Sequence, residues 1–161
     1  MVPPSLHRLG VRVLVAVILF PLPIRAADDP KALSPRTATL KGKVVSLAPL
    51  LDKFGARLDR DAAAQWMAFV TEDGTIYPLI KDDATRMFFQ DHSLQNRPMQ
   101  LTGRLIPGSQ LLQVQEVRSI VNGQLCELYY WCDICSIRRS EKKICECCGG
   151  PMILREDPVK K

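Results

Sequence analysis

Residues 131–151, WCDICSIRRSEKKICECCGGP, decide how the C-terminal part of this chain folds. They hold five of the six cysteines, and four of these form two CxxC pairs separated by nine residues: Cys132, Cys135, Cys145 and Cys148. Two intervening residues let both sulfurs of a pair reach one ion from a tight turn, and thiolates are favoured ligands of tetrahedral zinc. The spacing therefore predicts that these four cysteines hold one zinc ion.

The residues after the second pair carry a family resemblance. Gly149 and Gly150 follow Cys148, and a glycine there can take a positive φ that turns backbone N–H groups toward the sulfurs. The motif CxxCGGPM resembles the rubredoxin-type knuckle of zinc ribbons, whereas Ser136 stands at the glycine position of the first knuckle. The resemblance covers about the last 30 residues and implies a metal-binding ribbon with a short hairpin arm, residues 136–144.

Other uses of the cysteines have to be weighed against zinc. Six cysteines can pair as disulfides in 15 ways, but paired CxxC motifs are ligand spacing. Iron would use the same four thiolates. Covalent haem needs CxxCH, and Ser136 and Gly149 occupy the histidine positions. A redox dithiol is disfavoured because the flanks predict strand and turn rather than βαβ structure. Cys126 is expected to be a small buried apolar residue, and Cys147 can exchange with a neighbour as ligand.

The N-terminus has the pattern of a signal peptide, residues 1–26. An apolar run at 13–20 follows a basic start, and Ala26 precedes the predicted cleavage point. The run is shorter than the roughly 20 residues that cross a bilayer, so we expect an exported protein, periplasmic or secreted, with no transmembrane segment after cleavage. Export favours disulfides over free thiols, although bound metal protects thiolates in part.

The charge balance argues against a nucleic-acid partner. The formal net charge of the 161 residues is +5, from 22 basic and 17 acidic groups. Arg8, Arg12 and Arg25 belong to the predicted signal peptide, which leaves 19 basic groups against 17 acidic ones. Four thiolates with one Zn²⁺ add about −2, so the mature holoprotein is near neutral. The charge balance therefore does not indicate a general polyanion-binding surface.

The middle of the chain predicts a mainly β domain after a polar linker, residues 27–38. Alternating apolar residues and turn dipeptides such as Asn122-Gly123 predict strands at 39–47, 66–71, 75–80, 98–106, 110–121 and 124–131. A partly helical excursion is expected at 50–65, and a short helix capped by Asp82 or Asp83 at 82–90. Gly42 suggests a bend or bulge in the first strand, and 152–155 suggests a closing strand.

This order of elements, with phrases such as LTGRLIPGSQLLQV at 101–114, resembles the OB-fold, a five-stranded barrel with one helix between its third and fourth strands. The resemblance implies an OB-like barrel at 39–124. A zinc ribbon at 125–156 and a charged tail at 157–161 would follow it.

No catalytic constellation is apparent. His92 is the one histidine of the mature chain, and no nucleophile is placed near it by sequence. Three consecutive aromatic residues are expected to pack between barrel and ribbon: Tyr129, Tyr130 and Trp131. Four basic residues are expected at a solvated hairpin tip: Arg138, Arg139, Lys142 and Lys143.

We therefore expect a non-enzymatic binding or scaffold protein with an unidentified protein or small-molecule partner. One alternative is a thiol-redox, electron-transfer or metal-carrier protein that uses the CxxC pairs. The other is a nucleic-acid-binding protein that combines barrel and ribbon.

Overall fold

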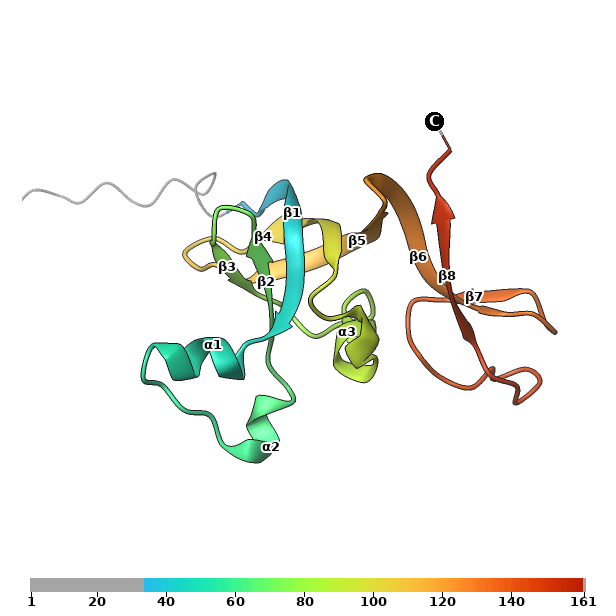
Figure 1. The fold of residues 1–161 in the computed structure, drawn as a ribbon, viewed down its shortest axis with the longest axis horizontal. Coiled ribbons are helices and arrows are strands. Elements are labelled where there is room, and N and C mark those ends of the chain that lie inside the picture. The colour runs from blue at the N-terminus through green and yellow to red at the C-terminus, as the bar shows by residue number, and fades with distance from the viewer. Residues whose placement is uncertain (1–33, 161) are drawn as a thin grey trace, which may run out of the picture.

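The computed structural model describes residues 34–160 (Figure 1). The predicted signal peptide and residues 27–33 of the predicted linker lie outside this range. Within it, the chain is mainly β with few helices, and an antiparallel sheet curls into a half-barrel. No helix among the described residues is long and apolar enough to cross a membrane.

The strands run in the order β3-β2-β1-β4-β5-β6-β7, and β8 pairs with β6. The predicted strands are found, and the first and last residue of each strand lie within three residues of the predicted ones. The elements are β1 (Arg36–Ser46), α1 (Ala48–Lys53), α2 (Arg60–Ala63), β2 (Met67–Thr71), β3 (Ile76–Pro78), α3 (Arg86–Gln90), the 3-10 turn η2 (His92–Leu94), β4 (Pro98–Leu105), β5 (Leu112–Val121), β6 (Gln124–Cys132), β7 (Ile137–Arg139) and β8 (Ile153–Pro158).

The sheet curls because of a bulge and a close backbone approach. The register between β4 and β5 shifts at Thr102/Gly103, where Gln115 is the extra residue of β5. Gly42, in contrast, interrupts no pairing, since β1 stays paired with both β2 and β4 there. A Cβ at Gly42 would lie 2.1 Å from the carbonyl oxygen of Val70, so the glycine permits close contact rather than a bulge.

A parallel contact brings the end of the sheet back toward its middle. Leu79, just after β3, forms an isolated parallel bridge with Leu112 at the start of β5. The N–H of Ile80 donates to the carbonyl oxygen of Leu112 at 3.0 Å. Met87 and Phe88 of α3 are buried in the core beneath these strands. The Asp82 carboxylate accepts from the N–H groups of Ala84 and Thr85, close to its predicted capping role.

The predicted ribbon, which contains β6, β7 and β8, continues the sheet rather than starting a separate layer. Asn122 and Gly123 have φ values of 51° and 78°, as a tight hairpin turn requires, and lead from β5 directly into β6. One edge of β6 pairs with β5 and then β7, and its other edge pairs with β8. The hydrophobic core is shared across the predicted domain boundary, because Leu128 and Tyr130 of β6 belong to the same cluster as Phe88.

Candidate metal centre

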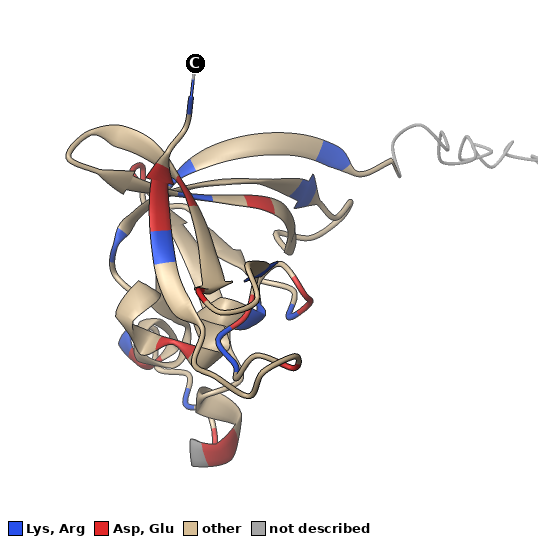
Figure 2. Cartoon of the chain, turned by 90° about the vertical axis from the view of Figure 1, so that its right-hand side faces the viewer, with Lys and Arg blue, Asp and Glu red and all other residues tan. Residues whose placement is uncertain are grey.

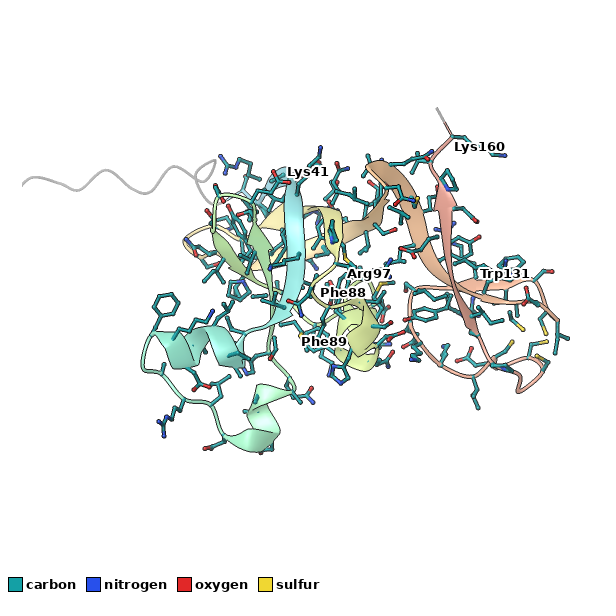
Figure 3. The ribbon with its side chains drawn as sticks, in the orientation of Figure 1. Lys41, Phe88, Phe89, Arg97, Trp131 and Lys160 are labelled. Atoms are coloured by element: carbon teal, nitrogen blue, oxygen red, sulfur yellow. The ribbon has the colours of Figure 1, made fainter. Side chains whose placement is uncertain are left out.

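Two turns of the ribbon bring the four predicted ligands together. Cys132 ends β6 and Cys135 lies in the turn before β7, while Cys145 and Cys148 lie in the loop before β8. Their four Sγ atoms are all within 4.8 Å of one another. Figure 3 shows the sulfur atoms gathered at the end of the ribbon, near β7. All six cysteines carry free thiols in the structure.

The spacing of the sulfurs fits one tetrahedral ion. Zinc–sulfur bonds of about 2.3 Å place tetrahedral sulfurs about 3.8 Å apart. The Sγ atoms of Cys132 and Cys148 are 3.5 Å apart, far longer than a disulfide bond of about 2.0 Å. The four cysteines can therefore bind a metal ion with small side-chain adjustments, and this arrangement is compatible with a zinc ribbon.

The two turns have matching backbones although their sequences differ. The N–H of Ser136 donates to the carbonyl oxygen of Cys132, and the N–H of Gly149 donates to that of Cys145, each at 2.8 Å. Ser136 has φ 56° and Gly149 has φ 69°. Ser136 thus adopts the left-handed conformation that a glycine would favour, so the first knuckle is regular in shape despite its serine.

Backbone donors and crowded thiols shift the acidity of the cluster in opposite directions. The N–H groups of Cys148 and Cys147 point at the Cys145 sulfur and lower its pKa to about 6. The neighbouring thiols of Cys147 and Cys148 raise the pKa of Cys135. Four sulfurs this close cannot all ionise alone, whereas a divalent cation would stabilise them together as thiolates.

Half of the cluster is inside the protein. The exposed fractions of Cys132 and Cys145 are 1% and 2%, and both belong to the core cluster, whereas Cys148 is exposed. Metal bound here would have buried ligands on one side and water on the other. Four protein sulfurs fill a tetrahedral shell, which is typical of structural rather than catalytic zinc.

A buried carboxylate that the sequence did not reveal connects the predicted ribbon to the half-barrel. The hydroxyl of Tyr130 donates to Asp91 at 2.7 Å, and Lys142 of the hairpin arm lies 3.3 Å from the same carboxylate. Burial opposes ionisation, yet hydrogen bonds from Ser93 and Tyr130 lower the pKa of Asp91 to about 2. The one local signal was the Asp-x-Ser pattern that caps the turn η2.

The predicted hairpin arm, residues 136–144, does not pair with itself, because its one strand, β7, pairs with β6. Further polar contacts hold this arm against α3. Arg86 pairs with Glu141 at 3.1 Å, and the Ser140 hydroxyl donates to the carbonyl oxygen of Asp83 at 3.1 Å. On β8, Glu156 pairs with Arg97, just before β4, at 2.5 Å. These contacts position both CxxC turns relative to the barrel.

The other predicted candidates do not converge on a second site. His92 is exposed and its Nδ1 lies 3.0 Å from the Gln95 amide nitrogen. Tyr130 points into the core, whereas the Tyr129 and Trp131 rings meet edge to face with centroids 6.3 Å apart. Each member of the basic cluster has a carboxylate partner: Arg138 with Glu127, Arg139 with Glu146, Lys142 with Asp91, and Lys143 with Glu141 and Glu146.

Figure 2 views the molecule from the side of β6, β7 and β8, and on this side basic and acidic residues are interspersed. Comparison of the chain with protein families, with curated proteins and with solved structures finds no match, so its chemistry is inferred from the arrangement of its own residues.

Proposed function

We propose that this chain is an exported, non-enzymatic binding or scaffold protein whose C-terminal ribbon is held by one structural zinc ion. The ligands are Cys132, Cys135, Cys145 and Cys148. The observation that carries the proposal is the clustering of these four thiols within 4.8 Å, with two of them buried in the common core. A closed shell of four protein ligands suits a structural site, because catalytic zinc keeps one position open.

The ribbon needs such an ion because it is short. Without the core that it shares with the preceding strands, a segment of this size has too little apolar surface to fold. Structural zinc in comparable modules contributes roughly 10–16 kcal/mol of binding free energy near pH 7. The buried sulfurs of Cys132 and Cys145 would place this stabilisation where the ribbon meets the barrel.

The first part of the described chain is proposed to be an OB-like barrel of β1 to β5. The strand order β3-β2-β1-β4-β5 supports this, as do the parallel bridge between Leu79 and Leu112 and the position of α3 between β3 and β4. The excursion that contains α1 and α2 would contribute to the recognition surface. Exposed Phe54 in this excursion and exposed Trp66 just after it are consistent with that role.

Export is proposed from the pattern of residues 1–26, and it bears on the partner. An exported protein is separated from most nucleic acid. The ion pairs of the basic cluster also reduce its attraction for phosphate. A protein or small-molecule partner is therefore preferred over a nucleic acid.

Substitution of one ligand tests the metal site. Cys148→Ser should lose stoichiometric zinc, and its ribbon should become sensitive to protease, because three thiolates and a weak hydroxyl bind zinc poorly. Cys147→Ser is the matched control, since it changes the adjacent cysteine and should keep the metal. Elemental analysis and limited proteolysis provide the readouts. Because Cys147 could replace Cys148 as a ligand, the double variant Cys147→Ser/Cys148→Ser completes the test, and full zinc retention by this variant would refute the assignment of Cys148.

A metal-carrier or electron-transfer role is the second candidate, and the exposure of Cys148 favours it. An open side lets a competing ligand reach the ion, and the same four thiolates would hold iron. A red purified protein, or transfer of zinc to a chelator within minutes, would support this role. A colourless protein whose zinc resists the chelator would rule it out.

A further inference from the structure

Two neighbouring hollows form a groove beside β1. The larger, of about 500 Å³, lies between α1 and the segment that precedes β4. The smaller, of about 340 Å³, continues from it toward the turn after β2. Both are lined by Lys43, Val70 and Asn96, so they are parts of one open trough, here called the β1 groove. Each hollow by itself falls within the roughly 300–1000 Å³ of typical ligand sites.

The groove exists because β1 loses one of its two neighbours before it ends. Its pairing with β4 stops at Lys43 opposite Pro98, whereas its pairing with β2 continues to Ser46 opposite Met67. Asn96 has φ 61° and turns the chain away before β4 begins. Its N–H donates to the carbonyl oxygen of Val44 at 2.8 Å, which fixes the wall of the groove.

The lining combines aliphatic surface with unpaired cations. Val45 and Val70 contribute from β1 and β2, and Pro49 and Leu50 contribute from the α1 side. Lys43 and Lys53 also line the larger hollow, and neither forms an ion pair within residues 34–160.

This lining contrasts with the hairpin arm, where every cation has a carboxylate partner. The one carboxylate of the groove, Glu72, lines only the smaller hollow. The larger hollow is therefore an apolar surface with positive charge on it.

We infer that the β1 groove binds an extended segment of a partner polypeptide in which acidic residues flank aliphatic ones. Carboxylates of such a segment would pair with Lys43 and Lys53, while its aliphatic side chains would cover Val45 and Val70. An open trough along a strand fits an extended chain. This inference rests on the proposed binding function, and it adds the class of partner.

The test uses the mature protein as purified, labelled with ¹⁵N, and two degenerate octapeptide pools. One pool alternates Asp or Glu with Leu, Val or Ile, and the other has Lys or Arg in place of the acids. The acidic pool should cause saturable shifts of amide signals around the groove, and the basic pool should not. The double variant Lys43→Glu/Lys53→Glu should weaken binding of the acidic pool roughly tenfold or more, because each attractive pair becomes a repulsive one.

Lys160→Glu is the matched control. It makes the same charge change, and Lys160 follows β8 on the side of the molecule away from α1 (Figure 3), outside the groove lining. It should alter the affinity by less than about twofold, since exposed charges at a distance are screened. The amide spectra also show whether each variant is folded.

Several results would overturn the inference: no saturable shift, equal binding of both pools, shifts remote from the groove, or equal weakening by Lys160→Glu. Decanoate, which has one carboxylate and an aliphatic chain, is added as a further probe. If decanoate binds and the acidic pool does not, the groove binds a small amphiphile rather than a polypeptide, which also overturns the inference. Zinc content measured on the same sample separates the two proposals. A sample without stoichiometric metal contradicts the proposed structural zinc site. A zinc-loaded sample that does not bind the acidic pool contradicts only the proposed peptide binding in the β1 groove.

Discussion

Ser136 and Gly149 occupy equivalent positions in the two CxxC turns, and the difference between them can be tested. Both have positive φ, which costs an L-residue about 1–2 kcal/mol relative to glycine. Nothing lies within 4 Å of a Cβ built on Gly149, so Gly149→Ala should lower the free energy of unfolding by about 1–2 kcal/mol through backbone strain alone. Ser136→Gly should be neutral or stabilise by up to about 1 kcal/mol. Urea unfolding of the metal-loaded variants measures both effects, and destabilisation by Ser136→Gly as large as that by Gly149→Ala would contradict the shared geometry.

Asp91 should make stability depend on pH in the acid range. Its pKa falls from 3.8 to about 2 on folding, so its contribution is complete above about pH 4 and is lost as the pH falls toward 2. The shift corresponds to at most about 2 kcal/mol. Asp91→Asn should therefore be less stable than the parent near neutral pH, and the gap should narrow between pH 4 and pH 2. Thermal unfolding of both proteins across this pH range measures the difference in stability. A difference that does not change with pH would show that Asp91 is not ionised in the folded protein.

At the scale of single elements, β1 depends on a residue without a side chain. A Cβ at Gly42 would lie 2.1 Å from a backbone oxygen of β2, and backbone cannot move aside as a flexible side chain can. Gly42→Ala should therefore destabilise the protein by about 3 kcal/mol through overpacking between β1 and β2. Lys41→Ala, on the exposed position beside it, should change stability by less than about 0.5 kcal/mol. Chemical unfolding of the two variants tests this, and equal stability would mean that the strands can separate without loss.

The elements themselves were predictable where the signal is local. Alternation of apolar residues marks β4 and β5, and the Asn122-Gly123 pair marks the turn between β5 and β6, because both patterns reflect neighbouring residues. The role of Gly42 was not predictable, since it depends on a strand that contacts it from elsewhere in the chain. The early start of β1 at Arg36 has the same origin, because Arg36 pairs with Leu105 of β4.

At the scale of the whole molecule, residues 34–160 form one sheet around one core, although the sequence suggests two units. The core cluster joins Met87 and Leu112 of the barrel to Tyr130, Cys145 and Met152 of the ribbon. Removal of the metal by a chelator should therefore lower the midpoint of a single unfolding transition, seen alike by far-UV circular dichroism and by Trp fluorescence. Two separate transitions, with the barrel unaffected by the chelator, would show that the units fold independently.

The candidate metal centre was predictable from sequence because CxxC places two ligands within one turn. Its connection to the barrel was not, since Asp91 and Tyr130 are 39 residues apart and meet only through tertiary packing. The β1 groove is a similar case, because Lys43 and Asn96 come from separate elements and become neighbours where β1 leaves β4.

X-ray absorption at the zinc edge, on protein purified from its native compartment, tests the central claim most directly. The account predicts one zinc ion with four sulfur neighbours at about 2.3 Å. A shell containing oxygen or nitrogen, or a metal-free protein whose mass shows the cysteines oxidised to disulfides, would contradict it.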